Sequence, residues 1–381
     1  MAVETNRQEL DRELTMTAAL PRVNILFRSE TDVDAWRTAH ARRERPDATP
    51  YGLHRIGEHG FDVSWESAAP ASRLQKLSLL APMRPTSASS TNGAGAGLAV
   101  TWDEHTAMRM QVAKRGGLQA TGVIWATDTL SAARLRASIE LAVLRRVLRR
   151  MTMLWCLSRA QLDPLSRWLG PGHPPIEFIR FGIDEDFFRP AAKPGQRTIL
   201  SLGNDQDRDP RCLLDAFSIV RERLGDVELR LQTKEDLPLP EGATRLPHLP
   251  HAALTAEYAR AHVVTVATKP NLHVSGMTTV LEAMASARPV VLSDTPGASD
   301  YVADDRWGYR AVPSDPQSLA QAMIRALDAD TGARLGAAGR QAVEERFTSR
   351  HMVAALSVAL HKAAALAASG SRLRRDATPA E

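Results

Sequence analysis

Short apolar runs rich in β-branched residues alternate along this chain with longer segments whose apolar positions recur every three or four residues. The runs have the length of buried strands, and the period of the longer segments is typical of helices that cover a sheet. The pattern predicts strands at 23–27, 61–65, 98–102, 122–126, 153–157, 176–181, 198–203, 227–232, 263–267, 289–293 and 309–312. It predicts helices near 132–150, 210–224, 252–261, 278–286, 316–329 and 352–367. Such alternation favours parallel sheets with helices on both faces, an α/β fold.

A polar segment at 188–197, which contains two prolines and a glycine, separates the earlier strands from the later ones. Segments of this composition commonly link domains, and 381 residues exceed what one hydrophobic core normally serves. We therefore expect two doubly wound, Rossmann-like domains at 1–190 and 191–381, of which the last helix could return to pack on the first domain. Two such domains place a cleft between the carboxyl ends of their strands, where these folds bind ligands.

Composition narrows the kind of protein and its partners. Apolar residues make up 44% and charged residues 24% of the sequence, which is typical of a globular protein. The formal charge of +4 fits an anionic ligand. The aromatic content is only 5%, and no basic run is interleaved with aromatic residues, which argues against binding of nucleic acid. Cys156 and Cys212 have no metal-ligand spacing and are expected to be buried free thiols. Without an apolar run long enough for a membrane span or a signal peptide, we expect a cytoplasmic protein.

The segment from Ser275 to Asp300, SGMTTVLEAMASARPVVLSDTPGASD, is the most informative part of the sequence. It leads from a loop containing Gly276 into a helix. A helix N-terminus suits a phosphate because its first backbone N–H groups are free and its dipole is positive there. Glu282 falls one turn inside, where a carboxylate can accept hydrogen bonds from the vicinal hydroxyls of a ribose. The spacing of Thr279 and Glu282 also fits a capping box, which is a purely structural interpretation.

The neighbouring residues favour a ligand site. Ser-Gly at 275–276 is followed in order by Leu-Glu-Ala-Met-Ala, Pro-Val-Val, Gly297, Asp-Tyr-Val at 300–302 and Trp-Gly at 307–308. Together they resemble the donor-nucleotide half of glycosyltransferase family 4, a GT-B family. Gly-Ile-Asp at 182–184 resembles the signature that closes the family's N-terminal domain, Ser-Leu-Gly at 201–203 resembles the start of its second domain, and 340–347 resembles its terminal helix. The resemblance covers about residues 176–360.

This resemblance implies a fold and a reaction. It implies two Rossmann-like domains facing a central cleft, and a nucleotide-sugar donor held mainly by the second domain. The sugar would pass to an acceptor hydroxyl or amine with retention of the anomeric configuration, an activity of the hexosyl and glycosyl transferases. No metal or other cofactor is expected, because a helix N-terminus and an arginine can supply the positive charge for the leaving diphosphate. The donor site would comprise Ser275, Gly276, Met277, Thr278, Thr279 and Glu282, together with Gly203 and Asn204.

The sequence departs from the family pattern at two donor-site positions. Eight positions before the ribose-binding glutamate, where the family has a carboxylate that contacts the donor sugar, this chain has Val274. Ser275 or Asn271 could substitute for it. The family's diphosphate-binding lysine corresponds to Arg208, but Asn204 stands near the place of the accompanying arginine. Arg208 could act in catalysis by stabilising negative charge on the leaving group, or it could form an ion pair with a neighbouring aspartate in an exposed turn.

The N-terminal domain, which binds the acceptor in the family, is less informative. Asp128, our second catalytic candidate, follows the strand expected at 122–126, near a place where the family often has a histidine. It could hydrogen-bond a donor-sugar hydroxyl or cap the following helix. The polar groups at 103–105 could likewise face the cleft or cap a helix. The first strand is not followed by a glycine-rich loop, and the nearest glycine is Gly52, so we expect a remodelled acceptor end.

The helix expected near 132–150 is basic, with Arg145, Arg146, Arg149 and Arg150 beside an apolar stripe. It could contact an anionic membrane peripherally at its inner face, or it could be an ordinary surface helix packed on the sheet, which is the interpretation we favour.

Two other functions fit the same fold: a catalytically inactive GT-B subunit that binds a partner or a nucleotide sugar, and a nucleotide-sugar epimerase. Uridine, guanosine and adenosine diphosphates are all compatible with the sequence. So are a small-molecule, polysaccharide or lipid acceptor.

Overall fold

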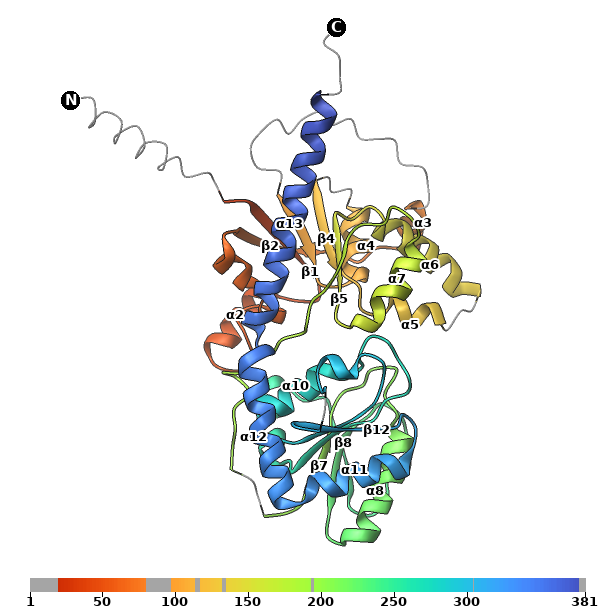
Figure 1. The fold of residues 1–381 in the computed structure, drawn as a ribbon, viewed down its shortest axis with the longest axis vertical. Coiled ribbons are helices and arrows are strands. Elements are labelled where there is room, and N and C mark those ends of the chain that lie inside the picture. Colours follow the sequence, from red (N-terminus) through yellow and green to blue (C-terminus); the bar gives the residue numbers. More distant parts are fainter. Residues whose placement is uncertain are drawn as a thin grey trace, which may run out of the picture.

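The computed structural model describes residues 20–79, 97–113, 117–131, 135–192, 195–303 and 305–376, which form two domains stacked along the long axis of the molecule (Figure 1). Each domain is built on a six-stranded sheet, and the strands within each sheet are parallel. This arrangement confirms the doubly wound α/β architecture expected from the alternation of strands and helices.

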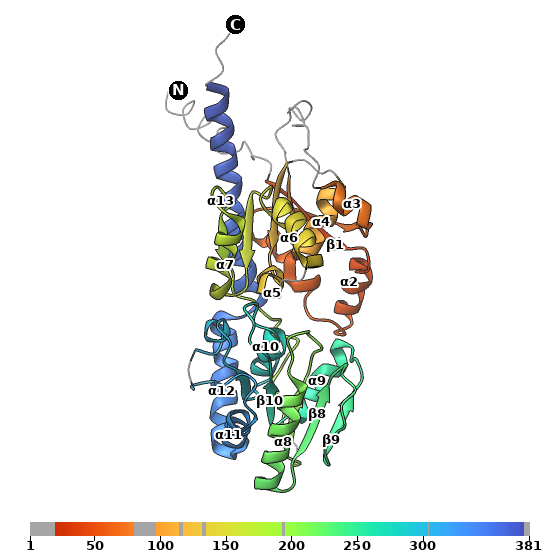
Figure 2. The ribbon, with the colours of Figure 1, turned by 90° about the vertical axis from the view of Figure 1, so that its right-hand side faces the viewer.

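The first sheet has the strand order β2-β1-β3-β4-β5-β6. Its strands are β1 (Arg22–Arg28), β2 (Asp62–Ala68), β3 (Leu98–Thr101), β4 (Leu118–Gly122), β5 (Met153–Cys156) and β6 (Ile176–Phe178). Alternate side chains face opposite sides, so Ile25 and Trp155 pack with the 3₁₀ segment η1 (Pro50–His59) and the last helix, α13 (Ser349–Asp376). Leu26 and Leu154 pack on the other side with α4 (Glu104–Val112), α6 (Leu135–Leu148) and α7 (Leu162–Leu169). Figure 2 shows α13 running along this domain.

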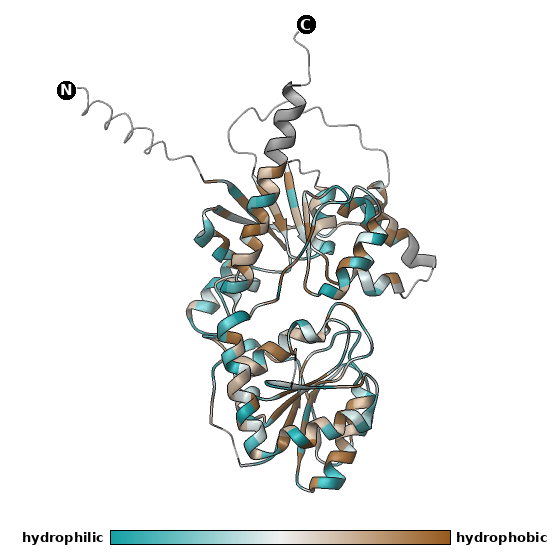
Figure 3. Cartoon of the chain, in the orientation of Figure 1, coloured by the Kyte–Doolittle hydropathy of each residue, from teal (hydrophilic) through white to brown (hydrophobic). Residues whose placement is uncertain are grey.

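The second sheet has the order β12-β11-β10-β7-β8-β9. Its strands are β7 (Thr198–Ser201), β8 (Glu228–Gln232), β9 (Ala243–Leu246), β10 (Val263–Val266), β11 (Val290–Ser293) and β12 (Gly308–Ala311). One face packs against α8 (Pro210–Leu224) and α11 (Pro316–Leu327), and the other against α10 (Met277–Ala285) and α12 (Ala329–Arg346). Helix α9 (His251–Arg260) precedes β10. The apolar strands between more polar helices are visible in Figure 3.

Both sheets have a point where the strand order reverses, between β1 and β3 in the first and between β7 and β10 in the second. At such a point the connections leave in opposite directions and open a crevice beyond the carboxyl ends of the strands. The loops after β7 and β10 border the crevice of the second domain, and those after β1 and β3 border that of the first. One cavity is lined by both Trp102 of the first domain and Glu282 of the second, so the crevices face each other.

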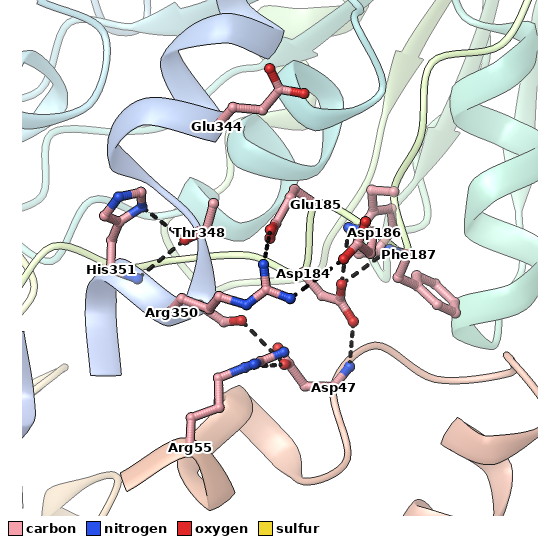
Figure 4. Close-up of polar contacts among 12 residues, drawn as sticks. Asp47, Arg55, Asp184, Glu185, Asp186, Phe187, Glu344, Thr348, Arg350 and His351 are labelled. Atoms are coloured by element: carbon pink, nitrogen blue, oxygen red, sulfur yellow. Dashed lines mark hydrogen bonds and ion pairs between the residues drawn. The ribbon is translucent and has the colours of Figure 1, made fainter. Parts of the chain in front are cut away.

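The chain crosses between the domains again at the turn between α12 and α13 (Figure 4). Ile183 pairs with this turn: its N–H donates to the Phe347 carbonyl, and the Ser349 N–H donates to the Ile183 carbonyl, both at 2.8 Å. A Cβ added to Gly182 would lie 2.2 Å from the Thr348 carbonyl oxygen. The close approach of the two segments therefore requires glycine at this position.

Asp184 extends this junction into the first domain (Figure 4). One of its oxygens accepts hydrogen bonds from the N–H groups of the following turn, and the other accepts from the Asp47 N–H at 2.6 Å. The Asp47 carboxylate in turn accepts from Arg55 and from Ser349 at the start of α13. Burial, reinforced by the neighbouring Asp184, raises the pKa of Asp47 to about 6.

One strand expected from the sequence is misplaced. The strand expected at 122–126 is observed as β4 (Leu118–Gly122), and α5 (Ala126–Ser131) begins where it was expected to end. The buried carboxylate of Glu104 accepts hydrogen bonds from the N–H groups of Ile124, Trp125 and Ala126, and so starts a helix there. The helix expected at 132–150 is observed as α6, with 132–134 outside the described residues. Strand β9 and most of α12 were not expected, because their apolar pattern is weak.

Cys156 and Cys212 are buried free thiols, as expected. Burial raises the pKa of both to about 12. Within the described part of the chain, none of the helices combines the length and apolarity needed to span a bilayer. Residues 1–19, on which the expectation of no signal peptide also depends, lie outside that part.

Candidate functional site

Arg208 places a positive charge at the crevice of the second domain. The loop after β7 positions it, with Gly203 at a φ of +103° and its N–H bonded to Gln232. The guanidinium donates to the Leu202 carbonyl at 2.6 Å and to the Thr279 hydroxyl at 3.3 Å. Within this described loop, the ion pair with a neighbouring aspartate that the sequence allowed is not formed. Although burial lowers its pKa to about 10, Arg208 remains charged at neutral pH.

Two glycines bring this arginine to the N-terminus of α10. A Cβ added to Gly203 would lie 2.5 Å from the Arg208 guanidinium, and one added to Gly276 would lie 2.7 Å from it. Gly276 is the N-cap residue, with a left-handed φ of 83°, and no side chain caps the helix. The N-terminus of α10, which no side chain caps, and the Arg208 charge are therefore adjacent, a suitable setting for a diphosphate.

The capping-box interpretation of Thr279 and Glu282 is wrong. Thr279 lies inside α10 rather than at its N-cap, and its hydroxyl contacts Arg208. The Glu282 carboxylate accepts a hydrogen bond from the Tyr258 hydroxyl at 2.6 Å. Burial raises the pKa of Glu282 to about 7, although this bond acts in the opposite direction. Tyr258 thus occupies one oxygen and orients the carboxylate, which leaves the other oxygen for a ligand.

Three cavities adjoin these groups. The cleft cavity, about 160 Å³, lies between the start of α10 and the first domain and is lined by Gly276, Thr278 and Trp125. The aromatic cavity, about 390 Å³, lies at the crevice of the first domain and extends to Thr278 and Glu282. The loop cavity, about 180 Å³, lies between the loop after β7 and the end of β8. Because Thr278 lines both the cleft cavity and the aromatic cavity, ligands in these two would be neighbours.

A buried histidine joins the two domains beside the cleft cavity. His273 Nδ1 lies 2.8 Å from Asp128 Oδ2, and its Nε2 lies 3.3 Å from Asp205 Oδ2. The Leu272 N–H also donates to Asp128 Oδ1, at 2.7 Å. Burial alone would lower the pKa of His273, but the hydrogen bonds to the two carboxylates outweigh it and raise the pKa to about 9. The protonated imidazole therefore bridges a carboxylate of each domain.

These contacts change the interpretation of Asp128. It is the third residue of α5 rather than its cap, and both of its oxygens accept hydrogen bonds from the second domain. Asp128, Asp207 and His273 bring ligand atoms within 4.8 Å of one another, as a metal site would. However, the ring nitrogens that would bind a metal are already bonded to carboxylates. The cluster acts structurally as a clamp between domains, and a direct catalytic role for Asp128 stays a prediction.

Val274, at the position where the family has a carboxylate, is buried and has a φ of 56°, which is rare for a β-branched residue. It packs beside Gly297, where an added Cβ would lie 2.4 Å from the valine side chain. Asn271 braces this loop, because its side chain accepts from the Ser275 N–H and donates to the Lys269 carbonyl. Of the two substitutes considered from the sequence, Ser275 lines the cleft cavity and Asn271 does not.

The structure brings together most of the expected donor-site residues. Ser275, Gly276, Met277 and Thr278 line the cleft cavity. Asn204 lies apart from them and, like Gly203, lines the loop cavity.

The polar residues after β3 act locally. Asp103 accepts from the Thr106 N–H and caps α4, and Glu104 caps the start of α5. For both residues the structural alternative therefore holds.

The basic helix α6 makes structural contacts. Arg145 and Arg149 both donate to the Leu169 carbonyl, and Arg149 also donates to the carbonyls of Gly170 and Pro171. The two side chains thus bind carbonyl groups that remain free at the end of α7. This supports the interpretation as a surface helix, and peripheral membrane contact stays a prediction.

Several residues of the site were not identified from the sequence. Tyr258 lies on a different helix from Glu282 and gives no local signal of its role. His273 directly precedes Val274, so its position in an informative loop could have singled it out. The ring of Tyr51 stacks on that of Trp102, with centroids 4.0 Å apart, and so joins loops far apart in the chain.

Comparison with known proteins agrees with this geometry. Residues 196–329 match the family model described as Glycosyl transferases group 1. Over 236 residues the chain is 29% identical to the MMP alpha-(1->4)-mannosyltransferase of Mycolicibacterium hassiacum, a match that covers 58% of this chain and 56% of that protein. The chain thus spans about half the length of this curated relative.

Solved structures share the fold. Sucrose-phosphate synthase from Thermosynechococcus elongatus has a TM-score of 0.65 at 16% identity, covering 91% of this chain and 100% of that chain. HepE from Anabaena, solved in complex with UDP and glucose, has a TM-score of 0.60 at 15% identity, covering 89% and 99%. The fold, with its two Rossmann-like domains and central cleft, is therefore the GT-B architecture. The match of residues 196–329 to the Glycosyl transferases group 1 model confirms the resemblance to family 4 for that part of the chain.

Proposed function

We propose that this protein transfers a sugar from a nucleoside-diphosphate sugar to an acceptor hydroxyl or amine. The observation that supports this most strongly is the Arg208 guanidinium, held between Gly203 and Gly276 at the uncapped N-terminus of α10. Glu282 follows one turn later and lines a cavity. The spacing suits a diphosphate at the helix end and a ribose at the carboxylate.

Each group then has a defined task. The diphosphate accepts hydrogen bonds from Arg208 and from the first N–H groups of α10, and the ribose hydroxyls donate to Glu282. The donor sugar occupies the cleft cavity, beside Ser275 and Val274. The clamp formed by His273 holds the two domains together over the donor, which limits the access of water.

In the transfer step the acceptor oxygen or nitrogen forms a bond to the anomeric carbon, and the bond from that carbon to the diphosphate oxygen breaks. The nucleoside diphosphate leaves with the bonding electrons and takes up the acceptor proton. Arg208 and the α10 dipole stabilise the negative charge that develops on the leaving group. Retention of configuration follows from the resemblance to family 4. The name of the mannosyltransferase relative makes mannose the first donor sugar to test.

A thermal-shift panel of UDP, GDP and ADP tests the donor site. A nucleotide at a hundred times its dissociation constant should stabilise the protein by about 2.7 kcal/mol. Glu282→Ala should weaken the shift, and Glu282→Gln, which keeps the side-chain volume beside Tyr258, separates loss of charge from loss of packing. The unliganded midpoint of each variant reports whether it folds. The donor site would be refuted if no nucleotide raised the midpoint, and the ribose role if Glu282→Ala responded like wild type.

The nucleotide identified in this panel, coupled to glucose or mannose, then distinguishes the reactions. Consumption of the donor with formation of a glycosylated acceptor supports transfer, and the anomeric coupling in the NMR spectrum of the product reports its configuration. An epimerised donor formed without acceptor would indicate an epimerase. Binding without any turnover would indicate a subunit that has lost catalysis.

A further inference from the structure

A groove that the proposed donor site does not use lies at the junction of the two domains. It runs between the C-terminal end of α2 (Val33–Ala41), the linker at 184–191 and one face of α9, and Figure 2 shows α2 and α9 on the same side of the molecule. We call it the junction groove. Its volume of about 810 Å³ falls within the roughly 300–1,000 Å³ of small-molecule sites. A ligand here would contact both domains and the linker at once.

The rim of the junction groove is basic. It is lined by His40, Arg43, Arg45 and Arg189. The acidic residues of the groove do not neutralise all of these charges, because Asp184 accepts hydrogen bonds at both oxygens and Asp186 pairs with Arg189. Among the described residues, neither Arg43 nor Arg45 has a carboxylate within ion-pair distance. Two positive charges from the first domain therefore border the groove without a counter-charge.

Arg45 is held in place at the rim. Its guanidinium lies over the Trp36 ring, 4.2 Å from the ring centroid. The Trp36 indole N–H donates to the Pro46 and Asp47 carbonyls, and its ring makes an edge contact with His251 of α9. Stacking of this kind leaves the N–H groups at the edge of the guanidinium available for an anion. Because the group is already positioned, less entropy is lost when a ligand binds to it.

Arg43 occupies a backbone position that favours other residues. Its N–H donates to the His40 carbonyl at 2.8 Å, and the Glu44 N–H donates to the Ala39 carbonyl at 2.9 Å, which closes the end of α2. This turn gives Arg43 a φ of 60°, where glycine or asparagine is usual. An arginine here costs stability relative to those residues. Strained residues of this kind concentrate at functional sites, where the side chain has a use.

The floor of the junction groove is mostly apolar. The face of α9 that borders it carries only small side chains, those of Ala252, Thr255, Ala256 and Ala259. Phe187 of the linker, which Figure 4 shows beside Asp184 and Asp186, adds an aromatic surface. The groove thus combines carbon surface at its floor with charged donors at its rim. This combination suits a compact carbon skeleton that carries anionic groups.

The chemistry of the rim favours phosphate among the common anionic groups. Guanidinium groups bind phosphate through paired N–H groups. At pH 7 a phosphate monoester carries about −1.5 to −2 charges and three acceptor oxygens, whereas a carboxylate carries a single charge and two oxygens. Two guanidinium groups without a counter-charge therefore match a phosphorylated ligand better than a carboxylate.

We propose that the junction groove binds a small phosphorylated molecule, whose phosphate groups bond to Arg43 and Arg45 and whose carbon skeleton lies on α9. The site is separate from the donor site at α10, and it does not depend on the proposed function. Its ligand bridges α2 of the first domain and α9 of the second, beside the linker that connects them.

Titration calorimetry tests this with fructose 1,6-bisphosphate and ribose 5-phosphate as probes, and with fructose and citrate as compounds that lack phosphate. We expect at least one phosphorylated probe to bind, citrate to bind at least about tenfold more weakly, and fructose not to bind. Arg43→Asn introduces a residue that tolerates the left-handed φ, so it should not lower the thermal midpoint of the unliganded protein. Arg43→Asn and Arg45→Gln should each weaken binding of the probe about tenfold.

Arg42→Gln is the matched control, because Arg42 belongs to the same turn but does not line the groove, and it should bind the probe like wild type. Gly276→Ala, which would displace Arg208 at α10, should also bind the probe like wild type. The unliganded midpoint of each variant reports whether it folds. The proposal is overturned if no phosphorylated probe binds, if citrate binds as tightly, or if either Arg43→Asn or Arg45→Gln binds like wild type. Loss of binding in Gly276→Ala would also overturn it, because the probe would then occupy the donor site.

Discussion

Replacing His273 with glutamine tests the clamp between the domains. His273 is buried, with its side chain 4% exposed, and bonds to Asp128 in one domain and Asp205 in the other. These bonds raise its pKa from an ordinary value of 6.5 to about 9, although burial opposes them. Glutamine has similar reach but cannot carry a charge, so the variant removes the proton-dependent part of the interaction.

The size of the effect follows from the two pKa values. Because the pKa is higher in the folded protein, protonation of His273 stabilises the fold fully below pH 6.5, and the contribution disappears as the pH rises through 9. At about 1.36 kcal/mol per pKa unit, the contribution is about 2.6 kcal/mol at pH 7, about 1.4 at pH 8 and about 0.4 at pH 9. The stability difference between wild type and His273→Gln should therefore shrink by about 2 kcal/mol from pH 7 to pH 9.

Urea unfolding followed by tryptophan fluorescence at pH 7, 8 and 9 measures this difference. His251→Gln is the control, because burial lowers the pKa of that histidine to about 4 and it is neutral over the whole range. Its stability difference from wild type should be independent of pH. If the wild-type and His273→Gln values instead differed by a constant amount from pH 7 to pH 9, His273 would not be protonated in the folded protein, and the clamp would not be ionic.

Three further predictions concern the donor site and the junction. Burial raises the pKa of Glu282 to about 7, so this carboxylate ionises between pH 6 and pH 8. Wild type should therefore bind nucleoside diphosphate more tightly at pH 8 than at pH 6. Titration calorimetry should show a weaker pH dependence of this affinity for Glu282→Gln. Gly276→Ala should displace the Arg208 guanidinium, which would lie 2.7 Å from the new methyl group, and weaken nucleotide binding by about tenfold or more; a wild-type affinity would contradict the diphosphate role. Gly182→Ala should lower the free energy of unfolding by about 2–4 kcal/mol, because the new Cβ would lie 2.2 Å from a carbonyl oxygen of the turn between α12 and α13. Gly195→Ala is the control, since no atom lies near its Cβ, and it should change the midpoint of urea unfolding little.

Most of the fold could be predicted from the sequence. Buried parallel strands are short and almost continuously apolar, as in Val263–Val266, and helices between them have their own period, so the alternation is visible in the residues alone. The predictions failed where a contact from elsewhere sets the local structure. The buried carboxylate of Glu104 ends the predicted extension of β4 by starting α5, and nothing within 122–126 indicates this.

The sequence by itself determined the local part of the donor site. Gly276, Thr278 and Glu282 belong to one loop and one helix, so their spacing fixes their relation. Only the tertiary structure decided what surrounds them. Tyr258 orients Glu282 from another helix, Arg208 reaches α10 past two glycines, and His273 joins Asp128 across 145 positions. These contacts depend on how two sheets and two domains pack, which spacing along one segment does not encode.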